Sequence, residues 1–142
     1  MIVLDTNVIS EVMRGPAASP VVLAWLRSLP EMPVTTVVNR AEILAGIAVL
    51  PDGERKRRLS EVAGTAFDTL GVCLPLMPEA ASAYAPIVAS RRSTGRPIGA
   101  MDALVAAIAR VSGASVATRD RPDFEGLGLD LVDPWRGPEA AD

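Results

Sequence analysis

The chain has 142 residues, of which 49% are hydrophobic and 22% charged, with a formal net charge of −3. This length and composition fit one globular domain and exclude a disordered chain. No run approaches the roughly 20 apolar residues of a membrane span, and no signal peptide is apparent, so we expect a cytoplasmic protein. The chain lacks histidine, and its single cysteine, Cys73, has no partner for a disulfide or for thiol catalysis.

Runs typical of strands alternate with runs typical of helices along the chain. In chain order the predicted elements are a strand at 2–4, helices at 7–14 and 21–29, a strand at 34–37, helices at 39–49 and 54–70, a strand at 72–76, helices at 78–94 and 98–112, and strands at 115–118 and 129–132. This alternation predicts an α/β fold with a mainly parallel sheet between two helical layers, a three-layer α/β/α sandwich. We assign residues 1–136 to one domain and residues 137–142 to a polar, frayed tail.

Local signals support several of these boundaries. Ser19 followed by Pro20 is a favourable helix start. Asn39, with Glu42 three positions later, has the spacing of a capping box and predicts a helix that begins there. Cys73 lies between apolar neighbours and is expected to be a buried thiol of the third strand.

Four carboxylates, Asp5, Glu42, Asp102 and Asp120, lie at the ends of otherwise apolar segments. Asp5 and Asp120 follow predicted strands, and the carboxyl ends of parallel strands are where open α/β sheets place their active sites. Glu42 and Asp102 lie near predicted helix starts, where the helix dipole favours anions. Without histidine, a cluster of acids is best suited to hold a hard cation such as Mg²⁺ or Mn²⁺.

Each acid also has a simpler interpretation when it is taken alone. Asp5 could cap the helix that follows it, and Glu42 could be only the capping-box partner of Asn39. Asp102 could be an ordinary acid of a first helical turn, and Asp120 a turn residue after a strand.

Four stretches of the chain resemble PIN-domain proteins, and most of all the FitB-like branch of the VapC toxins of type II toxin–antitoxin systems. These stretches are Leu-Asp-Thr-Asn-Val-Ile-Ser-Glu at 4–11, Arg-Ala-Glu-Ile at 40–43 followed by Gly46, Ala-Met-Asp-Ala at 100–103 followed by Ala106 and Ala107, and Val-Ala-Thr-Arg-Asp at 116–120. The branch also tends to end in a Pro-Trp element like Pro134-Trp135. The resemblance runs from residue 1 to about residue 136.

The resemblance implies a PIN-like sandwich whose acids bind Mg²⁺ or Mn²⁺ and cleave RNA with a metal-activated water. It implies a homodimer, a small cognate antitoxin, and contact with DNA only through that antitoxin. Such an antitoxin could block the acids by inserting an arginine. In this reading the catalytic acids are Asp5, Asp102 and Asp120 as metal ligands, and Glu42 as a ligand through water or as the group that orients or deprotonates the water.

The fourth acid leaves an alternative open, although Asp120 is favoured because it is nearer the strand end. Related sequences often carry a second acid three residues after the fourth, and this chain has Asp123 there, so Asp123 is an alternative to Asp120. The polar residues beside the acids, whose hydroxyl or amide groups could hold the carboxylates in place, are Thr6, Asn7, Thr118 and, less directly, Thr36.

Two rival functions compete with a ribonuclease. A phosphotransferase of the haloacid-dehalogenase type needs a second acid two residues after Asp5, where this chain has Asn7, and a late lysine, whereas Lys56 is the only lysine. A non-catalytic, metal-binding PIN-like interaction module would retain the four acids without turnover. The basic runs, such as residues 55–58, are typical of a solvated helix face, so charge alone does not identify the partner.

Overall fold

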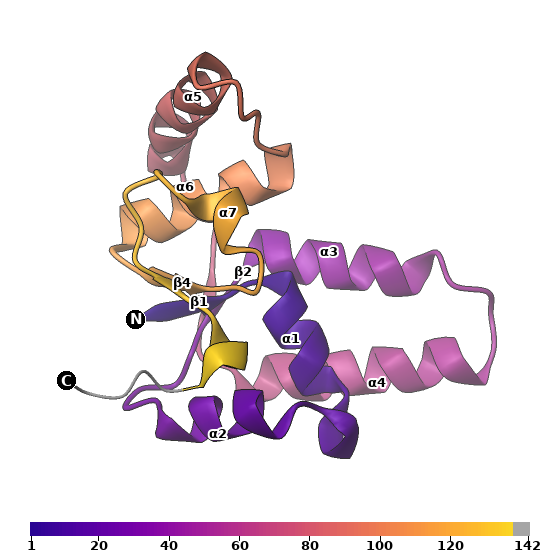
Figure 1. Cartoon of the computed structure of the whole chain (residues 1–142). Helices are drawn as coiled ribbons and strands as arrows, with labels where there is room; N and C mark the ends of the chain where they lie inside the picture. Colours follow the sequence, from indigo (N-terminus) through magenta and orange to yellow (C-terminus); the bar gives the residue numbers. More distant parts are fainter. Residues whose placement is uncertain (138–142) are drawn as a thin grey trace.

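The computed structural model describes residues 1–137, in which helices and parallel strands alternate as predicted (Figure 1). The elements in chain order are β1 (Ile2–Leu4), α1 (Thr6–Met13), η1 (Gly15–Ala17), α2 (Pro20–Ser28), β2 (Thr35–Thr36), α3 (Val37–Ala48), α4 (Glu54–Thr69), β3 (Cys73–Leu74), α5 (Pro78–Ser93), α6 (Ala100–Ser112), β4 (Ser115–Ala117), α7 (Arg121–Phe124), β5 (Leu131–Val132) and η2 (Pro134–Arg136).

The strands lie in the order β3-β2-β1-β4-β5, and every pairing is parallel. β1 pairs with β4 in the register Ile2 to Ser115, and a bridge between Val3 and Val34 joins β1 to the β2 side. That junction consists of two 2.9 Å backbone bonds, from the Leu4 N–H to the Val34 carbonyl and from the Val34 N–H to the Ile2 carbonyl. The first strand of the chain is therefore the centre of the sheet.

Alternate residues of the central strands face opposite layers of helices. Val3 and Val116 belong to the apolar cluster that contains α5 and α6, whereas Leu4 and Ala117 belong to the cluster that contains α1, α2, α3 and α4. Figure 1 shows α5 and α6 on one side of the strands and α1, α2 and α4 on the other. The three-layer α/β/α sandwich predicted from the sequence is confirmed.

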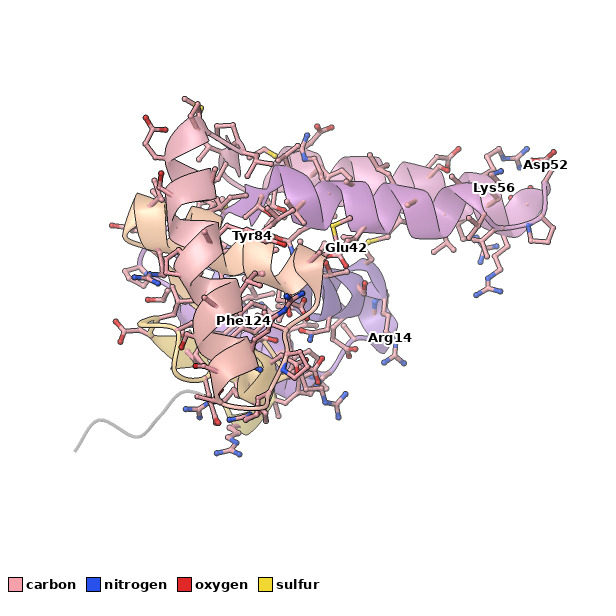
Figure 2. All side chains as sticks on the ribbon, turned by 90° about the horizontal axis from the view of Figure 1, so that it is seen from above. Arg14, Glu42, Asp52, Lys56, Tyr84 and Phe124 are labelled. Atoms are coloured by element: carbon pink, nitrogen blue, oxygen red, sulfur yellow. The ribbon has the colours of Figure 1, made fainter. Side chains whose placement is uncertain are left out.

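Helices α3 and α4 form an antiparallel hairpin that projects from the body of the molecule (Figures 1 and 2). At its tip the Lys56 ammonium donates to the Ala48 carbonyl at 3.1 Å and to the Asp52 carboxylate at 3.2 Å. Between the two helices, the Arg40 guanidinium lies 4.6 Å from the centre of the Phe67 ring. The only lysine of the chain thus closes the turn of this hairpin.

Several predicted boundaries were wrong. Helix α3 begins at Val37 rather than at Asn39, because the Thr36 hydroxyl already caps it by accepting the Asn39 N–H at 3.1 Å, so there is no Asn39–Glu42 capping box. Cys73 is half-buried instead of buried, since β3 is a short strand at the sheet edge. The last predicted helix begins at Ala100, and the short helix α7 was not predicted.

Three further observations concern helix α5, membrane spanning and the C-terminal tail. Helix α5 continues through Pro86 without interruption. No helix within residues 1–137 is both long and apolar enough to cross a membrane. The predicted frayed tail lies outside the described residues, except for Gly137.

The fold predicts a large difference between two valine-to-alanine substitutions. Val116 is fully buried in β4 between β1 and β5, whereas Val49 at the end of α3 is 83% exposed. We expect Val116→Ala to lower the free energy of unfolding by about 2 kcal/mol, since it removes buried methyl groups and leaves a cavity. Val49→Ala should change it by less than about 0.5 kcal/mol. Urea denaturation measures both, and equal losses would contradict the assigned core.

Candidate active site

Three polar side chains lie side by side where neighbouring parallel strands end. Thr36 ends β2, Asp5 directly follows β1, and Thr118 directly follows β4. All three are buried, with Asp5 only 6% exposed. The carboxyl edge of the sheet is thus where the sequence predicted the site to be.

The Asp5 carboxylate accepts four hydrogen bonds. Its Oδ1 atom accepts from the Thr6 backbone N–H at 2.8 Å and from the Asn39 amide at 3.3 Å. Its Oδ2 atom accepts from the Thr118 hydroxyl at 2.8 Å and from the Asn7 amide at 3.5 Å. Burial raises the pKa of Asp5, while the bonds from Thr118 and Thr6 oppose that rise by stabilising the anion. Asp5 also occupies the cap position of α1, so the capping interpretation is confirmed, and its role in a metal site stays a prediction.

Glu42 joins this network through Thr6. The Thr6 hydroxyl donates to Glu42 Oε1 at 3.0 Å and accepts from the Asn39 amide at 3.1 Å. Glu42 lies in α3, one turn after Asn39, and the two side chains share a helix face because residues three apart are neighbours there. The predicted site residue from α3 is therefore linked to the strand edge.

Asn39 is a site residue that the sequence interpretation missed. It is fully buried, and its amide nitrogen bridges Asp5 and Thr6 while its carbonyl oxygen accepts from the Thr36 hydroxyl at 2.6 Å. We had interpreted Asn39 as a helix cap. Its spacing of three residues before Glu42 was the available signal, because that spacing also places both residues on one face.

Asn7 connects Asp5 to Asp120. Its amide nitrogen lies 3.1 Å from Asp120 Oδ2 and 3.3 Å from the Thr118 hydroxyl, and its carbonyl oxygen accepts the Arg119 N–H at 3.3 Å. The Thr118 hydroxyl also accepts the Asp120 N–H at 3.0 Å. The structure thus brings Thr6, Asn7 and Thr118 into contact with the acids that they were expected to support.

Asp102 lies in the first turn of α6 and interacts with the other acids through charge repulsion. Burial is the largest influence on it, and repulsion from Asp5, Asp123, Glu42 and Asp120 adds to it, which together raise the pKa of Asp102 to about 6. The repulsion that Asp102 receives from Asp123 is larger than the repulsion from Glu42 or from Asp120. Asp102 is therefore near enough to Asp5, Glu42, Asp120 and the alternative Asp123 to be repelled by their charges.

The donor set fits a hard divalent cation in its chemistry. It consists of carboxylate oxygens, which Mg²⁺ and Mn²⁺ prefer, and their mutual repulsion is what a cation would remove. Within residues 1–137, however, no three acidic or cysteine side chains form a ready metal-binding group. Among these residues no N–H or O–H group donates a hydrogen bond to the Asp102 carboxylate, so this carboxylate is uncommitted. Both oxygens of Asp5, in contrast, accept hydrogen bonds.

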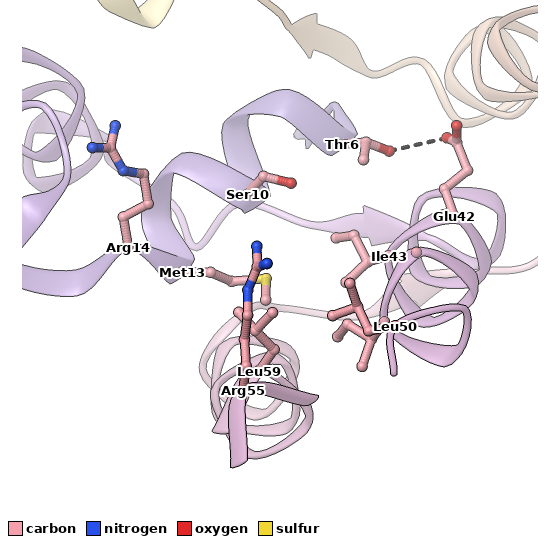
Figure 3. A pocket seen from close by; sticks show the side chains of 11 residues that line it. Thr6, Ser10, Met13, Arg14, Glu42, Ile43, Leu50, Arg55 and Leu59 are labelled. Atoms are coloured by element: carbon pink, nitrogen blue, oxygen red, sulfur yellow. Dashed lines mark hydrogen bonds between the residues drawn. The ribbon is translucent and has the colours of Figure 1, made fainter. Parts of the chain in front are cut away.

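A groove of about 390 Å³ begins at Thr6 and Glu42 and runs between α1 and the α3–α4 hairpin. Figure 3 shows Thr6 and Glu42 at its edge and apolar side chains turned toward the hollow. The residues that line it are Thr6, Ser10, Met13, Arg14, Glu42, Ile43, Gly46, Ile47, Leu50, Arg55 and Leu59. One site acid, Glu42, thus borders a largely apolar groove that also contains Arg14 and Arg55.

The raised pKa of Asp102 predicts a pH-dependent stability of the metal-free protein. The carboxyl has an ordinary pKa of 3.8 and one of about 6 in the folded protein, so its stabilisation is present at low pH and is lost as the pH rises through about 6. We expect Asp102→Asn in EDTA to raise the melting temperature at about pH 7.5, and the gain to disappear as the pH falls toward about 4.

Thermal melts followed by circular dichroism measure this difference. Asp68→Asn, an exposed change on α4, is the matched control and should show no such pH dependence. A constant difference between Asp102→Asn and the wild type across this range would contradict the electrostatic description of the site.

Comparisons with known proteins agree with this geometry. The PIN domain family model matches residues 2–127. The chain is 39% identical to the VapC ribonuclease Y4jK of Sinorhizobium fredii, over 95% of this chain and 98% of that protein. It is 37% identical to the toxin FitB of Neisseria gonorrhoeae, over 95% of this chain and 99% of that toxin.

A solved structure of FitAB bound to an IR36 DNA fragment is also similar. It superposes with a TM-score of 0.83 at 34% identity, over 99% of this chain and 100% of the matched one. The match therefore extends over the whole fold and includes the edge of the sheet that carries the acids. The chain belongs to the PIN-domain family, in the group that contains the VapC and FitB toxins.

Proposed function

We propose that this protein is a metal-dependent endoribonuclease that acts as the toxin of a toxin–antitoxin pair. The observation that carries the proposal is the gathering of Asp5, Glu42, Asp102 and Asp120 at the carboxyl edge of a parallel sheet. The similarity to a VapC ribonuclease and to FitB supports the same activity.

Asp5, Asp102 and Asp120 are the carboxylates that we propose hold Mg²⁺ or Mn²⁺. When bound, such a cation lowers the pKa of a coordinated water and neutralises charge on a scissile phosphate. Asp5 is fixed by its four donors, Asp120 is oriented by the Asn7 amide, and the uncommitted Asp102 is able to turn toward a cation. The chain's contribution is thus to keep negative charge concentrated in a largely preorganised place.

Glu42 is the best-placed group to accept a proton from the attacking water. Thr6 holds its Oε1 atom at 3.0 Å, and Oε2 has no protein donor within residues 1–137. Glu42 also borders the open groove, whereas Asp5 is buried. We therefore separate the roles: Glu42 orients or deprotonates water, and the three aspartates hold the cation.

We propose a cognate antitoxin as the second partner, with DNA contacted only through it. A solved relative is the FitAB complex on DNA, which supports this assignment. The groove between α1 and the α3–α4 hairpin would accept an apolar segment, and its acidic end would accept an arginine in charge-assisted bonds to the carboxylates.

A homodimer is the third part of the proposal. Large apolar side chains are exposed on α3, on α6 and in the segment before α5, and α3 packs against α6. Among them are Val37, Leu44, Leu76, Met77 and Met101. Exposed apolar groups on neighbouring elements are typical of a protein–protein interface.

The cleavage activity is tested on a panel of structured RNAs with Mg²⁺ or Mn²⁺. We expect cleavage by the wild type, none in EDTA, and none by Asp102→Asn. Glu42→Gln should lower the rate by roughly 100-fold while Mn²⁺ still binds, because it removes a proton acceptor and no ligand. Asp68→Asn should cleave like the wild type. Folded protein that binds Mn²⁺ without cleaving any RNA of the panel would favour the non-catalytic binding module instead.

The dimer is tested by sedimentation of charged variants on one helix. We expect Leu44→Glu to shift the protein from dimer to monomer, since it places a charge in the middle of the apolar face, where Leu44 is 51% exposed. Val49→Glu, at the end of the same helix, should leave the dimer intact. A monomeric wild type, or a dimer that tolerates Leu44→Glu, would refute the assigned face.

A further inference from the structure

Arg91 is a buried arginine without an acidic partner. It lies in the last turn of α5 and is only 7% exposed, while the neighbouring Arg92 is exposed. No carboxylate within residues 1–137 forms an ion pair with it. Because a buried charge is costly unless hydrogen bonds compensate it, the contacts of Arg91 show which parts of the chain hold it in place.

Every bond of the Arg91 guanidinium goes to a backbone carbonyl. Its Nε atom donates to the Arg96 carbonyl at 2.7 Å, and its Nη1 atom donates to the carbonyls of Asp123 at 2.9 Å and Glu125 at 3.4 Å. The planar guanidinium therefore ties the end of α5 to two other segments. One is the loop after α5, and the other is α7 with the residue that follows it.

These two segments lead directly to acids of the site. The loop that contains Arg96 runs into α6, whose first turn carries Asp102. Helix α7 carries Asp123 and starts immediately after Asp120. A second bond, from Arg96 Nη2 to the Pro122 carbonyl at 3.1 Å, joins the same loop to α7. The late acids thus approach the strand edge on segments that are fastened to each other through Arg91.

The early acids have a different support. Asp5 and Glu42 are linked by Thr6 on α1 and Asn39 on α3, neither of which contacts Arg91 among the described hydrogen bonds. The site therefore consists of two halves. The early half, Asp5 and Glu42, is held by hydroxyl and amide side chains. The late half, Asp102 and the Asp120–Asp123 segment, lies on backbone that the Arg91 guanidinium binds through carbonyl groups. Asn7 and Thr118 bridge the two halves: the Asn7 amide donates to Asp120, and the Thr118 hydroxyl donates to Asp5 and accepts the Asp120 N–H.

We infer that Arg91 is a positioning residue, which sets the placement of Asp102 and of the Asp120–Asp123 segment relative to Asp5 through its bonds to the Arg96, Asp123 and Glu125 carbonyls. This inference rests on the proposed metal-dependent function. The competing explanation is that Arg91 only stabilises the packing of α5, which the buried Ile87 one turn earlier also does.

The test compares four variants of the full chain. Arg91→Lys keeps the charge but cannot reproduce the planar fork of donors. Arg96→Gln keeps the carbonyl that Arg91 binds and removes only the bond to Pro122. Ile87→Val is the stability control on the same face of α5, and Arg92→Lys is the matched exposed control. Mn²⁺ affinity is measured by calorimetry, and amide hydrogen exchange is measured in the metal-free protein.

We expect Arg91→Lys to weaken Mn²⁺ binding by about tenfold, the scale of losing a group that orients metal ligands. Exchange should accelerate at residues 94–103 and 120–126 together, while residues 2–8 and 36–42 keep the wild-type rate. Arg96→Gln should give a smaller loss in the same direction. Ile87→Val should lower the melting temperature without changing Mn²⁺ affinity, and Arg92→Lys should change neither.

Two results would overturn the inference. The first is an Mn²⁺ affinity equal to that of the wild type in both Arg91→Lys and Arg96→Gln. The second is an equal loss of Mn²⁺ affinity in Arg91→Lys and Ile87→Val when the two variants have the same melting temperature. A wild type that binds Mn²⁺ in either case would leave the proposed function standing. A wild type that binds no Mn²⁺ would instead refute the proposed function, and this role of Arg91 with it.

Discussion

The burial of one carboxylate at the end of the central strand determines how the surrounding residues are arranged. Asp5 lies between the ends of β2 and β4, where water is largely excluded, and an ionised group in such a place needs donors. Thr6, Asn7, Asn39 and Thr118 supply them from two helix starts and a neighbouring strand end. Asn39 and Thr118 are fully buried and Thr6 and Asn7 are half-buried, because the anion requires their donors.

The remaining acids add a cost that the donors do not remove. Repulsion from four other carboxylates contributes to the raised pKa of Asp102, so the protein stores unfavourable electrostatic energy at this edge of the sheet. Such a concentration of charge weakens the fold by itself, and it is useful only if a cation or a cationic side chain completes it. The proposed metal, and the arginine of a proposed antitoxin, would both answer the same electrostatic need.

Features that are repeated along the chain could be predicted from the sequence, and features that depend on tertiary contacts could not. The alternation of strands and helices is predicted by the pattern of apolar residues along the chain. The acids at the strand ends are predicted by that pattern and by the resemblance to PIN-domain proteins. The start of α3 was misplaced because Thr36 and Asn39 are both acceptable caps, and only the buried carboxylate of Asp5 decides that the amide of Asn39 turns inward.

The hydrogen bonds of Arg91 to the Arg96, Asp123 and Glu125 carbonyls could not be predicted for a related reason. A run that contains two adjacent arginines is typical of a solvated helix face, and no local pattern indicates which of Arg91 and Arg92 turns into the protein. Helix α7 escaped prediction because a four-residue element has too little periodicity to be recognised. In both cases the missing information lies in contacts between residues about thirty positions apart.

The central position of β1 also has a consequence for the synthesis of the protein. β1 leaves the ribosome before the other four strands, but its partner β4 begins only at Ser115, so the centre of the sheet cannot close until β4 has been made. Pairings of such large sequence separation form slowly. The edge that gathers the acids is therefore absent from every nascent chain that ends before β4, so the buried charge of Asp5 is enclosed only late in folding.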